Sequence, residues 1–327
     1  MTASHGPGLA RLAPRPALRA LHDVGRAVDV VLGDVTLARY VYVPDDVQLE
    51  SPRPYVHPLR TRGGDLVSEF RPHDHVWHKG IAWSLPVVGD ENFWGGPTFV
   101  SLAASEHGYV QLDNDGSMDH TALTRLDVAT GPAGERVDLA HTLAWHTQAG
   151  EHVVDEVREL SVVVPPDRDD AWVLLFTTTM TNVSGRELPI GSPTTRGREN
   201  AGYGGLFWRG PRSFTGGTLL APGFAGGEEV RGRRGPWMGF TGRLDGTGNA
   251  ATVVMVDGTG NPSHPPQWFA RRDMFACLCP APFFSEEVDF DPGVSLTFRY
   301  AVVVADGTGD PGHAAALAEL GGGMLGA

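Results

Sequence analysis

The chain has little cysteine and no long apolar run. Its 327 residues include only two cysteines, Cys277 and Cys279, and a bridge between them would close a very small, strained ring. We therefore expect both thiols to be reduced, which is typical of a reducing compartment and predicts a cytoplasmic protein. No stretch approaches the roughly 18 apolar residues that cross a bilayer, and the N-terminus lacks a secretory signal pattern. A membrane partner is therefore not expected.

Positive charge is also scarce. The chain has 26 Lys and Arg residues against 39 Asp and Glu residues, so its formal net charge is −13. An acidic protein repels phosphate backbones, so nucleic acid is not an expected partner either.

Glycine and proline are abundant, with 43 and 25 residues, and they favour many short strands over long helices. Residues 27–43 alternate apolar and polar side chains around a Gly33-Asp34 turn, which predicts a hairpin. Similar strand patterns occupy residues 98–114, 129–147, 152–166, 171–191 and 294–305. The sequence predicts an all-β protein built of stacked antiparallel sheets, with one short helix near residues 312–320.

No low-complexity linker divides the chain into separate domains. Residues 1–22 are predicted to form a flexible tail with one turn of helix at Ala17–His22, and residues 23–327 a single β-sandwich domain. The Pro- and Gly-rich segment 211–236 is predicted to be a loop that covers a site.

Three histidines lie within six positions in the sequence RPHDHVWHKG. His73, His75 and His78 are accompanied by Asp74 and Lys79. One interpretation is an ordinary polar loop. A second is a metal site with the three histidines as ligands, because residues i and i+2 of an extended segment share a face and imidazole is a common ligand for zinc, iron or copper.

A third interpretation is proton transfer without a metal. A histidine with a pKa near neutrality suits a general acid or base, and Asp74, Glu91 or Glu199 is the candidate partner carboxylate. Lys79 would keep neighbouring histidines neutral or stabilise a developing anion.

Aromatic residues near the polar segments suggest a carbohydrate ligand, because aromatic faces beside polar groups are suited to holding sugar rings. Trp94 follows the histidine segment, and Trp268 follows His264 in the Pro-rich sequence NPSHPPQW. A further polar, Gly-rich segment, residues 192–214, carries the consecutive residues Arg198, Glu199 and Asn200. Each of these segments also has a plain structural interpretation, as a connecting loop or a core tryptophan.

Taken together, these segments resemble the PmoA-like family of uncharacterised bacterial proteins, also described as domain of unknown function 6807. The resemblance rests on RPYVHPL at residues 53–59, RPHDHVWHKG, Phe93-Trp94, the Asn-Pro-x-His-Pro-x-x-Trp pattern of residues 261–268, and Val-Ala-Asp-Gly at residues 304–307. It covers about residues 40 to 307. Two positions depart from the family pattern: Trp77 stands where the family often has His, and Lys79 where it often has Arg.

The resemblance implies a large supersandwich similar to that of aldose epimerases, which use a His acid and a Glu base across a sugar ring. It also implies a functional link to sugar oxidoreductases and sugar isomerases. The family label itself suggests an oxygenase-type metal enzyme, but the methane monooxygenase subunit behind that label is an integral membrane protein, whereas this chain has no membrane span.

The combined prediction is a carbohydrate-active protein that performs epimerisation, mutarotation or elimination on a sugar, with no cofactor. His75, His78 and Glu199 are the predicted acid–base groups. The predicted substrate contacts are His73, Asp74, Lys79, Trp94, Arg198, Asn200, His264 and Trp268. Two alternatives stay open: a divalent-metal enzyme with His73, His75 and His78 as ligands, and a sugar-binding module without catalysis.

Overall fold

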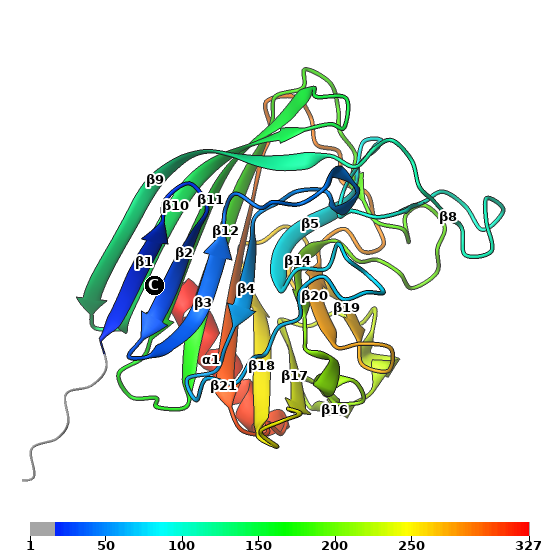
Figure 1. Cartoon of the computed structure of the whole chain (residues 1–327). Coiled ribbons are helices and arrows are strands. Elements are labelled where there is room, and N and C mark those ends of the chain that lie inside the picture. The colour runs from blue at the N-terminus through cyan, green and yellow to red at the C-terminus, as the bar shows by residue number, and fades with distance from the viewer. Residues whose placement is uncertain (1–16, 327) are drawn as a thin grey trace, which may run out of the picture.

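Alternating inward and outward side chains build two large antiparallel sheets that face one another (Figure 1). The computed structural model describes residues 17–326. Within that range the strands form a ten-stranded sheet, a nine-stranded sheet and a two-stranded ribbon. The main hydrophobic core lies between the two large sheets and includes the fully buried Trp83, Trp145 and Trp172. The prediction of an all-β protein with stacked antiparallel sheets is confirmed.

The first sheet carries the histidine segment between two of its strands. Its strands, in spatial order, are β1 (Leu18–Asp23), β2 (Ala27–Leu32), β3 (Val35–Val41), β4 (Tyr55–Leu59), β5 (Ile81–Val88), β14 (Gly205–Arg209), β20 (Cys277–Ala281) and β19 (Gln267–Arg271). The short strands β6 (Glu91–Phe93) and β13 (Ile190–Gly191) pair with β5 off this path. The predicted hairpin around Gly33-Asp34 is the β2–β3 pair.

The second sheet contains the longest strands. In spatial order they are β16 (Phe224–Gly226), β15 (Thr218–Ala221), β17 (Trp237–Arg243), β18 (Ala250–Asp257), β21 (Ser295–Asp306), β12 (Ala171–Asn182), β11 (His152–Val164), β10 (Gly134–His146) and β9 (Ser117–Gly131). The ribbon consists of β7 (Thr98–Phe99) and β8 (Tyr109–Val110). Three short 3-10 turns, η1 (Gln48–Glu50), η2 (Arg212–Phe214) and η3 (Glu228–Val230), lie between strands.

The helix α1 (Pro311–Leu325) covers the outer face of the second sheet (Figure 1). It begins with an Asp310 N-cap, whose carboxylate accepts a hydrogen bond from the His313 amide at 2.8 Å, and with Pro311 in the first turn. Leu317 and Ala318 pack against β18 and β21. The predicted helix near residues 312–320 is confirmed. No helix within residues 17–326 has the length and apolar character needed to cross a membrane.

Three local predictions need correction. Leu18–Asp23 is the strand β1, paired with β2, so the predicted tail and helical turn are wrong from residue 18 onward, and the tail's first 16 residues lie outside the described range. Residues 211–236 are not a single loop, since they contain β15 and β16. Residues 98–114 hold only the two-residue strands β7 and β8, because most of their apolar side chains find no sheet to pack on.

The strands β14, β19 and β20 are buried on both faces, and this creates a second apolar layer on the first sheet. Trp208 of β14 and Leu278 of β20 point into the main core. Phe207 of β14 and Phe269 of β19 point to the opposite face, where they join the side chains of Cys277 and Cys279. This outer layer is the floor on which the candidate site is built. Both cysteines are free thiols, as predicted.

An ion pair is buried in the main core on β11. Glu156 and Arg158 occupy the inward-facing row of that strand, and the Arg158 Nε donates to Glu156 Oε1 at 2.6 Å. Trp145 Nε1 and Thr178 Oγ1 also donate to the same carboxylate, at 2.8 and 2.7 Å. Burial disfavours the charged guanidinium, but the Glu156 carboxylate outweighs it and raises the pKa of Arg158. The Arg158 guanidinium therefore stays charged inside the sandwich.

Replacing Glu156 by Gln should lower the free energy of unfolding by about 3 kcal/mol, because it leaves the buried Arg158 without its counter-charge. Urea denaturation of the two proteins measures the difference. The matched control is Glu159→Gln on the same strand, whose carboxylate is 44% exposed and pairs with Arg125 at 3.2 Å. That change should cost less than about 0.5 kcal/mol. Equal losses for the two variants would contradict the prediction.

Candidate active site

The histidine segment is a loop whose two ends are held by one buried carboxylate. Glu50, at the end of η1, is 1% exposed and accepts hydrogen bonds from Arg71 Nε at 3.0 and 3.1 Å. Its other neighbour is the Lys79 ammonium, 3.0 Å from Glu50 Oε2, which also contacts Asp46. Burial opposes ionisation of Glu50, but Arg71 and Lys79 lower its pKa. The loop from residue 71 to residue 79 is therefore closed at its base by charge.

A buried arginine supports the same loop from below. Arg53 is 2% exposed and donates hydrogen bonds to the backbone carbonyls of Glu50, Ser51 and Trp77 at 2.7, 2.8 and 2.7 Å. Burial lowers the pKa of Arg53 to about 10, so the guanidinium remains charged at neutral pH. The loop backbone is thus tied to the core at Trp77, between two of the three histidines.

His75 forms a dyad with Asp74. The His75 Nδ1 lies 3.0 Å from Asp74 Oδ2. Burial disfavours ionised Asp74, but hydrogen bonds from His75 and from its own backbone amide, together with the Arg209 charge, hold its pKa well below its usual value. Since an ionised carboxylate only accepts, Nδ1 of His75 carries the proton. In the neutral ring, Nε2 of His75 then keeps a free lone pair.

His78 has the opposite tautomer. It is 3% exposed, and its Nδ1 lies 3.0 Å from Nη1 of Arg209. A guanidinium only donates, so Nδ1 accepts and the proton of the neutral ring is on Nε2. Burial, with further contributions from the charges of His75 and Arg209, lowers the pKa of His78 well below its usual value. His78 is therefore a neutral hydrogen-bond donor.

The two imidazoles lie side by side with opposite roles. Their rings stack with centroids 4.7 Å apart and an interplanar angle of 14°. Burial lowers the pKa of His75, the Asp74 carboxylate partly offsets this, and the charges of Arg209 and Arg271 lower it further. Both rings are therefore neutral at neutral pH. The ring nitrogens that Asp74 and Arg209 leave unused are therefore Nε2 of His75, a proton acceptor, and Nε2 of His78, a proton donor.

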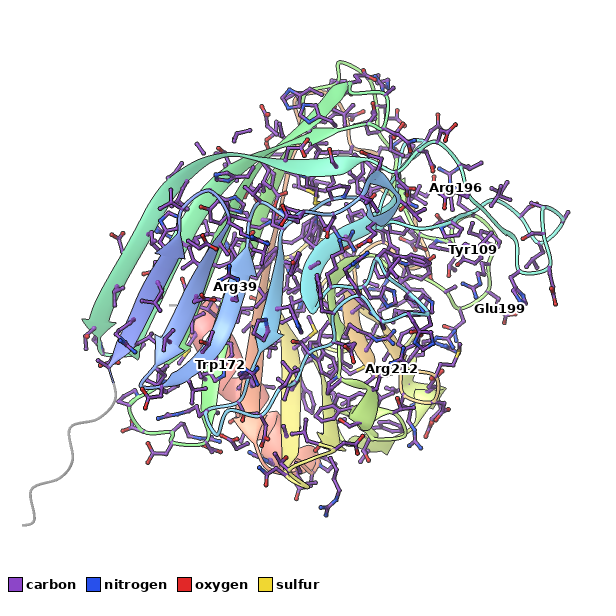
Figure 2. All side chains as sticks on the ribbon, viewed as in Figure 1. Arg39, Tyr109, Trp172, Arg196, Glu199 and Arg212 are labelled. Atoms are coloured by element: carbon purple, nitrogen blue, oxygen red, sulfur yellow. The ribbon has the colours of Figure 1, made fainter. Side chains whose placement is uncertain are left out.

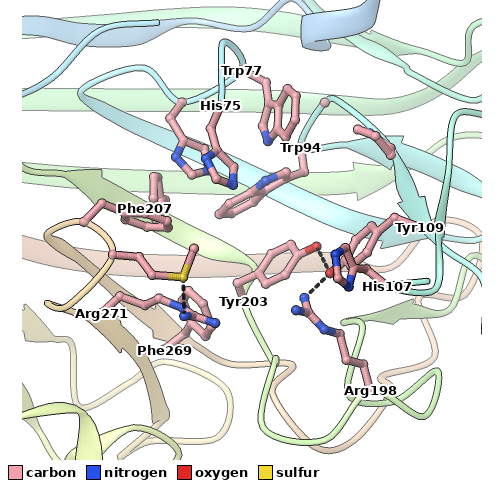
Figure 3. Close-up of a pocket in the computed structure, with 15 residues that line it drawn as sticks. His75, Trp77, Trp94, His107, Tyr109, Arg198, Tyr203, Phe207, Phe269 and Arg271 are labelled. Carbon is pink, nitrogen blue, oxygen red and sulfur yellow. Dashed lines mark hydrogen bonds between the residues drawn. The ribbon is translucent and has the colours of Figure 1, made fainter. Parts of the chain in front are cut away.

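The histidine pair forms one wall of a cavity of about 360 Å³ (Figure 3). That volume lies within the usual range of small-molecule sites, about 300–1,000 Å³. Aromatic side chains form much of its lining, and they are Trp77, Trp94, Tyr109, Tyr203, Phe207, Phe269 and Phe275. Trp94 and Tyr203 pack together with ring centroids 4.6 Å apart. A flat ligand would have aromatic faces on several sides.

The end of the cavity opposite the histidines is built by loops (Figure 3). Tyr109 belongs to β8, and its hydroxyl lies 2.9 Å from the Tyr203 hydroxyl. Arg198 donates a hydrogen bond to the same Tyr109 hydroxyl, and its guanidinium lies 4.9 Å from the centre of the Tyr109 ring. His107, in the connection between β7 and β8, also contributes to this wall.

The structure brings four of the predicted site residues together. His75, His78, Trp94 and Arg198 all line this cavity. Asp74 does not line it but positions His75. His73 points elsewhere, since it is exposed and its Nδ1 accepts a hydrogen bond from Arg212 at 3.0 Å.

Other predicted residues lie outside the cavity. Lys79 is fully buried in the ion cluster around Glu50, so its ammonium does not reach a ligand. Glu199 and Asn200 are exposed and do not line the cavity (Figure 2 labels Glu199). Trp268 is fully buried in the main core, with its Nε1 donating to the Gly235 carbonyl at 2.7 Å.

His264 lies in a second cavity, of about 480 Å³, beside α1. Its Nδ1 is 2.6 Å from Oδ2 of Asp257, a carboxylate that also accepts a hydrogen bond from Asn261 at 2.7 Å. The Pro-rich segment therefore does not approach the histidine pair.

The three histidines do not form a metal site of the predicted kind. Within the described part of the chain, no group of three or more His, Cys, Asp or Glu side chains could hold a metal ion. The physical reason is that guanidinium groups occupy this neighbourhood: Arg212 donates to His73, and Arg209 donates to His78. The Nδ1 atoms of these two histidines are therefore occupied by hydrogen bonds and are not available to a metal ion.

Sequence reasoning missed several residues of the cavity, among them Tyr109, Tyr203, Phe207 and Arg271. Phe207 and Phe269 alternate along their strands with the core residues Trp208 and Trp268. Apolar side chains at consecutive positions of a strand indicate that both of its faces are buried, and this signal could have identified Phe207. Tyr109 and Arg271 carry no comparable signal, because their place depends on how distant loops meet.

The family comparison agrees with the resemblance proposed from the sequence. Residues 27–319 match the model of DUF6807, described as a family of unknown function. No match was found among the curated proteins.

Solved structures with a similar arrangement were also found. A provisionally assigned aldose 1-epimerase from Klebsiella pneumoniae is 10% identical over 90% of this chain and 79% of its own, with a TM-score of 0.38. A GH36 alpha-galactosidase from Geobacillus stearothermophilus is 10% identical over 89% of this chain and 41% of its own, with a TM-score of 0.37. A provisionally assigned kojibiose phosphorylase from the human microbiome is 9% identical over 63% of this chain and 22% of its own, with a TM-score of 0.31.

The chain spans less than half the length of the last two proteins. At these TM-scores the likenesses say nothing about activity, which has to be judged from the site itself. The family match, in contrast, extends over most of the sequence, from the second strand of the first sheet into α1. The chain therefore belongs to the DUF6807 family.

Proposed function

We propose that this protein is a carbohydrate-active enzyme that moves a proton at a carbon next to a carbonyl group of a sugar or sugar derivative. The observation that carries the proposal is the reciprocal protonation of His75 and His78, stacked 4.7 Å apart on the wall of an aromatic cavity. A base and a hydrogen-bond donor side by side match the two neighbouring atoms of such a substrate, the acidic C–H and the carbonyl oxygen.

The proton-abstraction step uses only the groups of this chain. Nε2 of His75 takes the proton from carbon, the C–H electron pair becomes the new C=C bond, and the carbonyl π electrons move to oxygen. Nε2–H of His78 holds that oxygen by a hydrogen bond. Protonation of the same carbon by water on the other face, with His75 releasing its proton to solvent, gives an epimer. Return of the proton from His75 to the former carbonyl carbon, with transfer of the adjacent hydroxyl proton to the former carbonyl oxygen, gives an isomer. Departure of a β-substituent with its bonding electron pair gives elimination.

The neutral state of His78 favours this chemistry over mutarotation. Opening a sugar ring needs an acid that transfers a whole proton to the ring oxygen. His78, deeply buried and facing Arg209, donates a hydrogen bond but has no dissociable imidazolium proton at neutral pH. Stabilising an oxyanion by hydrogen bonding is the role that a neutral imidazole performs well.

A sugar ligand is supported by the shape and composition of the cavity. The Trp94 and Tyr203 rings give apolar faces for the C–H side of a pyranose, and Tyr109, His107 and Arg198 offer hydrogen bonds to hydroxyl groups. The predicted link to sugar oxidoreductases stays a prediction from the resemblance.

The direct test of catalysis is His75→Ala, which should reduce the rate of C–H exchange about 10²- to 10⁴-fold while leaving sugar affinity nearly unchanged. Exchange is measured by NMR as deuterium incorporation from D₂O into a panel of keto- and aldo-sugars and sugar acids. His73→Ala and Glu199→Gln serve as controls, because both side chains lie outside the cavity, and they should exchange at the rate of the unmodified protein. Binding without exchange in the unmodified protein would show a sugar-binding module instead.

The pH dependence of kcat/KM provides a second test. His75 works as a base only when neutral, so activity should fall as the pH falls through its pKa. Burial lowers that pKa, which places the acidic limb below the ordinary histidine value of about 6.5. Asp74→Asn removes the negative charge that favours protonation of His75. The acidic limb of the kcat/KM profile should therefore move to still lower pH, and the maximum value of kcat/KM should fall. An unchanged profile would show that His75 is not the base.

A further inference from the structure

We infer that the substrate carries an oxyanion, a carboxylate or a phosphate, which is bound by one of the two arginines that line the cavity, Arg271 or Arg198. This inference rests on the proposed function for the identity of the ligand as a sugar, and it adds the charge of that ligand. The evidence for this charge is the sign of the side chains around the cavity, which is positive although the protein as a whole is negative.

The cavity is cationic although the protein is acidic. Among the described residues that line it, none is Asp or Glu, whereas two are arginines and three are histidines. The whole chain has a formal net charge of −13. A water-filled cavity with uncompensated positive groups and low-dielectric aromatic walls attracts an anion.

Arg271 has no carboxylate partner in the described part of the chain. Its Nη1 contacts the sulfur of Met274 at 3.1 Å, and its guanidinium lies 5.8 Å from the centre of the Phe269 ring. The next residue, Arg272, does have such a partner, since its Nε donates to Asp273 at 3.0 Å. Of these two neighbouring arginines, the one that lines the cavity is the one left uncompensated.

Arg198 shows the same contrast with its neighbour. Within residues 17–326 it has no carboxylate within ion-pair distance, and it is held instead by the Tyr109 hydroxyl and ring. Arg196, two positions earlier and outside the cavity, pairs with Glu287 at 3.1 Å. A third arginine close to both, Arg231, is neutralised by Glu228 at 3.1 Å. Arg271 and Arg198 therefore keep an uncompensated positive charge at the cavity, whereas their neighbours Arg272 and Arg196 are paired.

The two arginines lie at different ends of the cavity (Figure 3). Arg271 is on the side of His75 and Arg198 is beside Tyr109. An oxyanion on Arg271 sits near the base. For a sugar carboxylate, neutralisation by the guanidinium would make the neighbouring C–H more acidic. An oxyanion on Arg198 sits across the ring from the base and serves binding alone.

The test compares three probes of similar size by isothermal titration calorimetry: D-glucose, D-glucuronate and D-glucose 6-phosphate. At least one anionic probe should bind about 10-fold or more tightly than glucose, and its affinity should weaken with added salt. At least one of the variants Arg271→Gln and Arg198→Gln should reduce that affinity about 10- to 100-fold, the usual loss for a charge-assisted hydrogen bond, and the variant that does so identifies the arginine that holds the oxyanion. Their neighbours Arg272→Gln and Arg196→Gln should bind like the unmodified protein.

Each outcome decides the inference. Preference for glucuronate identifies a carboxylate, and preference for the phosphate ester identifies a phosphate. Equal affinity for glucose and both anions, no binding by any probe, or equal losses in the cavity variants and their neighbours would overturn it. The C–H exchange of His75→Ala is measured on neutral sugars as well, so the proton-transfer proposal stands or falls separately.

Discussion

The carboxylate of Glu50 is the interaction on which the candidate site depends. It is buried at the base of the histidine loop and binds Arg71 at one end and Lys79 at the other, while Arg53 ties the middle of the loop to the core at Trp77. Without this carboxylate, two cations would remain close together around a loop whose backbone bonds alone are few. The fixed position of His75 and His78 relative to each other follows from this anchoring.

The period of a β-strand explains why a site exists on the outer face of the first sheet. In β14, β19 and β20 the residues facing the core and the residues facing away are both apolar, so a second layer of side chains is needed to cover them. The histidine loop and the loops bearing Trp94, Tyr109 and Arg198 provide that cover. These loops do not cover the outer apolar layer completely, and the space that remains is the aromatic cavity.

The sequence was sufficient for the fold class, because alternation, turn residues and the capped C-terminal helix are local signals. Of the residues that the sequence predicted for the site, His75, His78, Trp94 and Arg198 line the cavity. Lys79, Trp268 and Glu199 lie outside it, since a polar or aromatic residue near a motif can face the core, the cavity or solvent. Tyr109 and Arg271 come from segments far apart in the chain, and only long-range packing brings them together. The reciprocal tautomers depend on Asp74 and Arg209, and Arg209 lies 131 positions from His78.

The two walls of the cavity differ in how they are held. The histidine wall is attached to buried charges of the sandwich, whereas the opposite wall comes from the β7–β8 connection and the loop before β14, joined by the Tyr109, Tyr203 and Arg198 contacts. Insertions or substitutions in those loops would change the cavity without removing the buried charges that hold His75 and His78 in place. The shape of the cavity can therefore vary with its loops while the histidine wall keeps its anchoring.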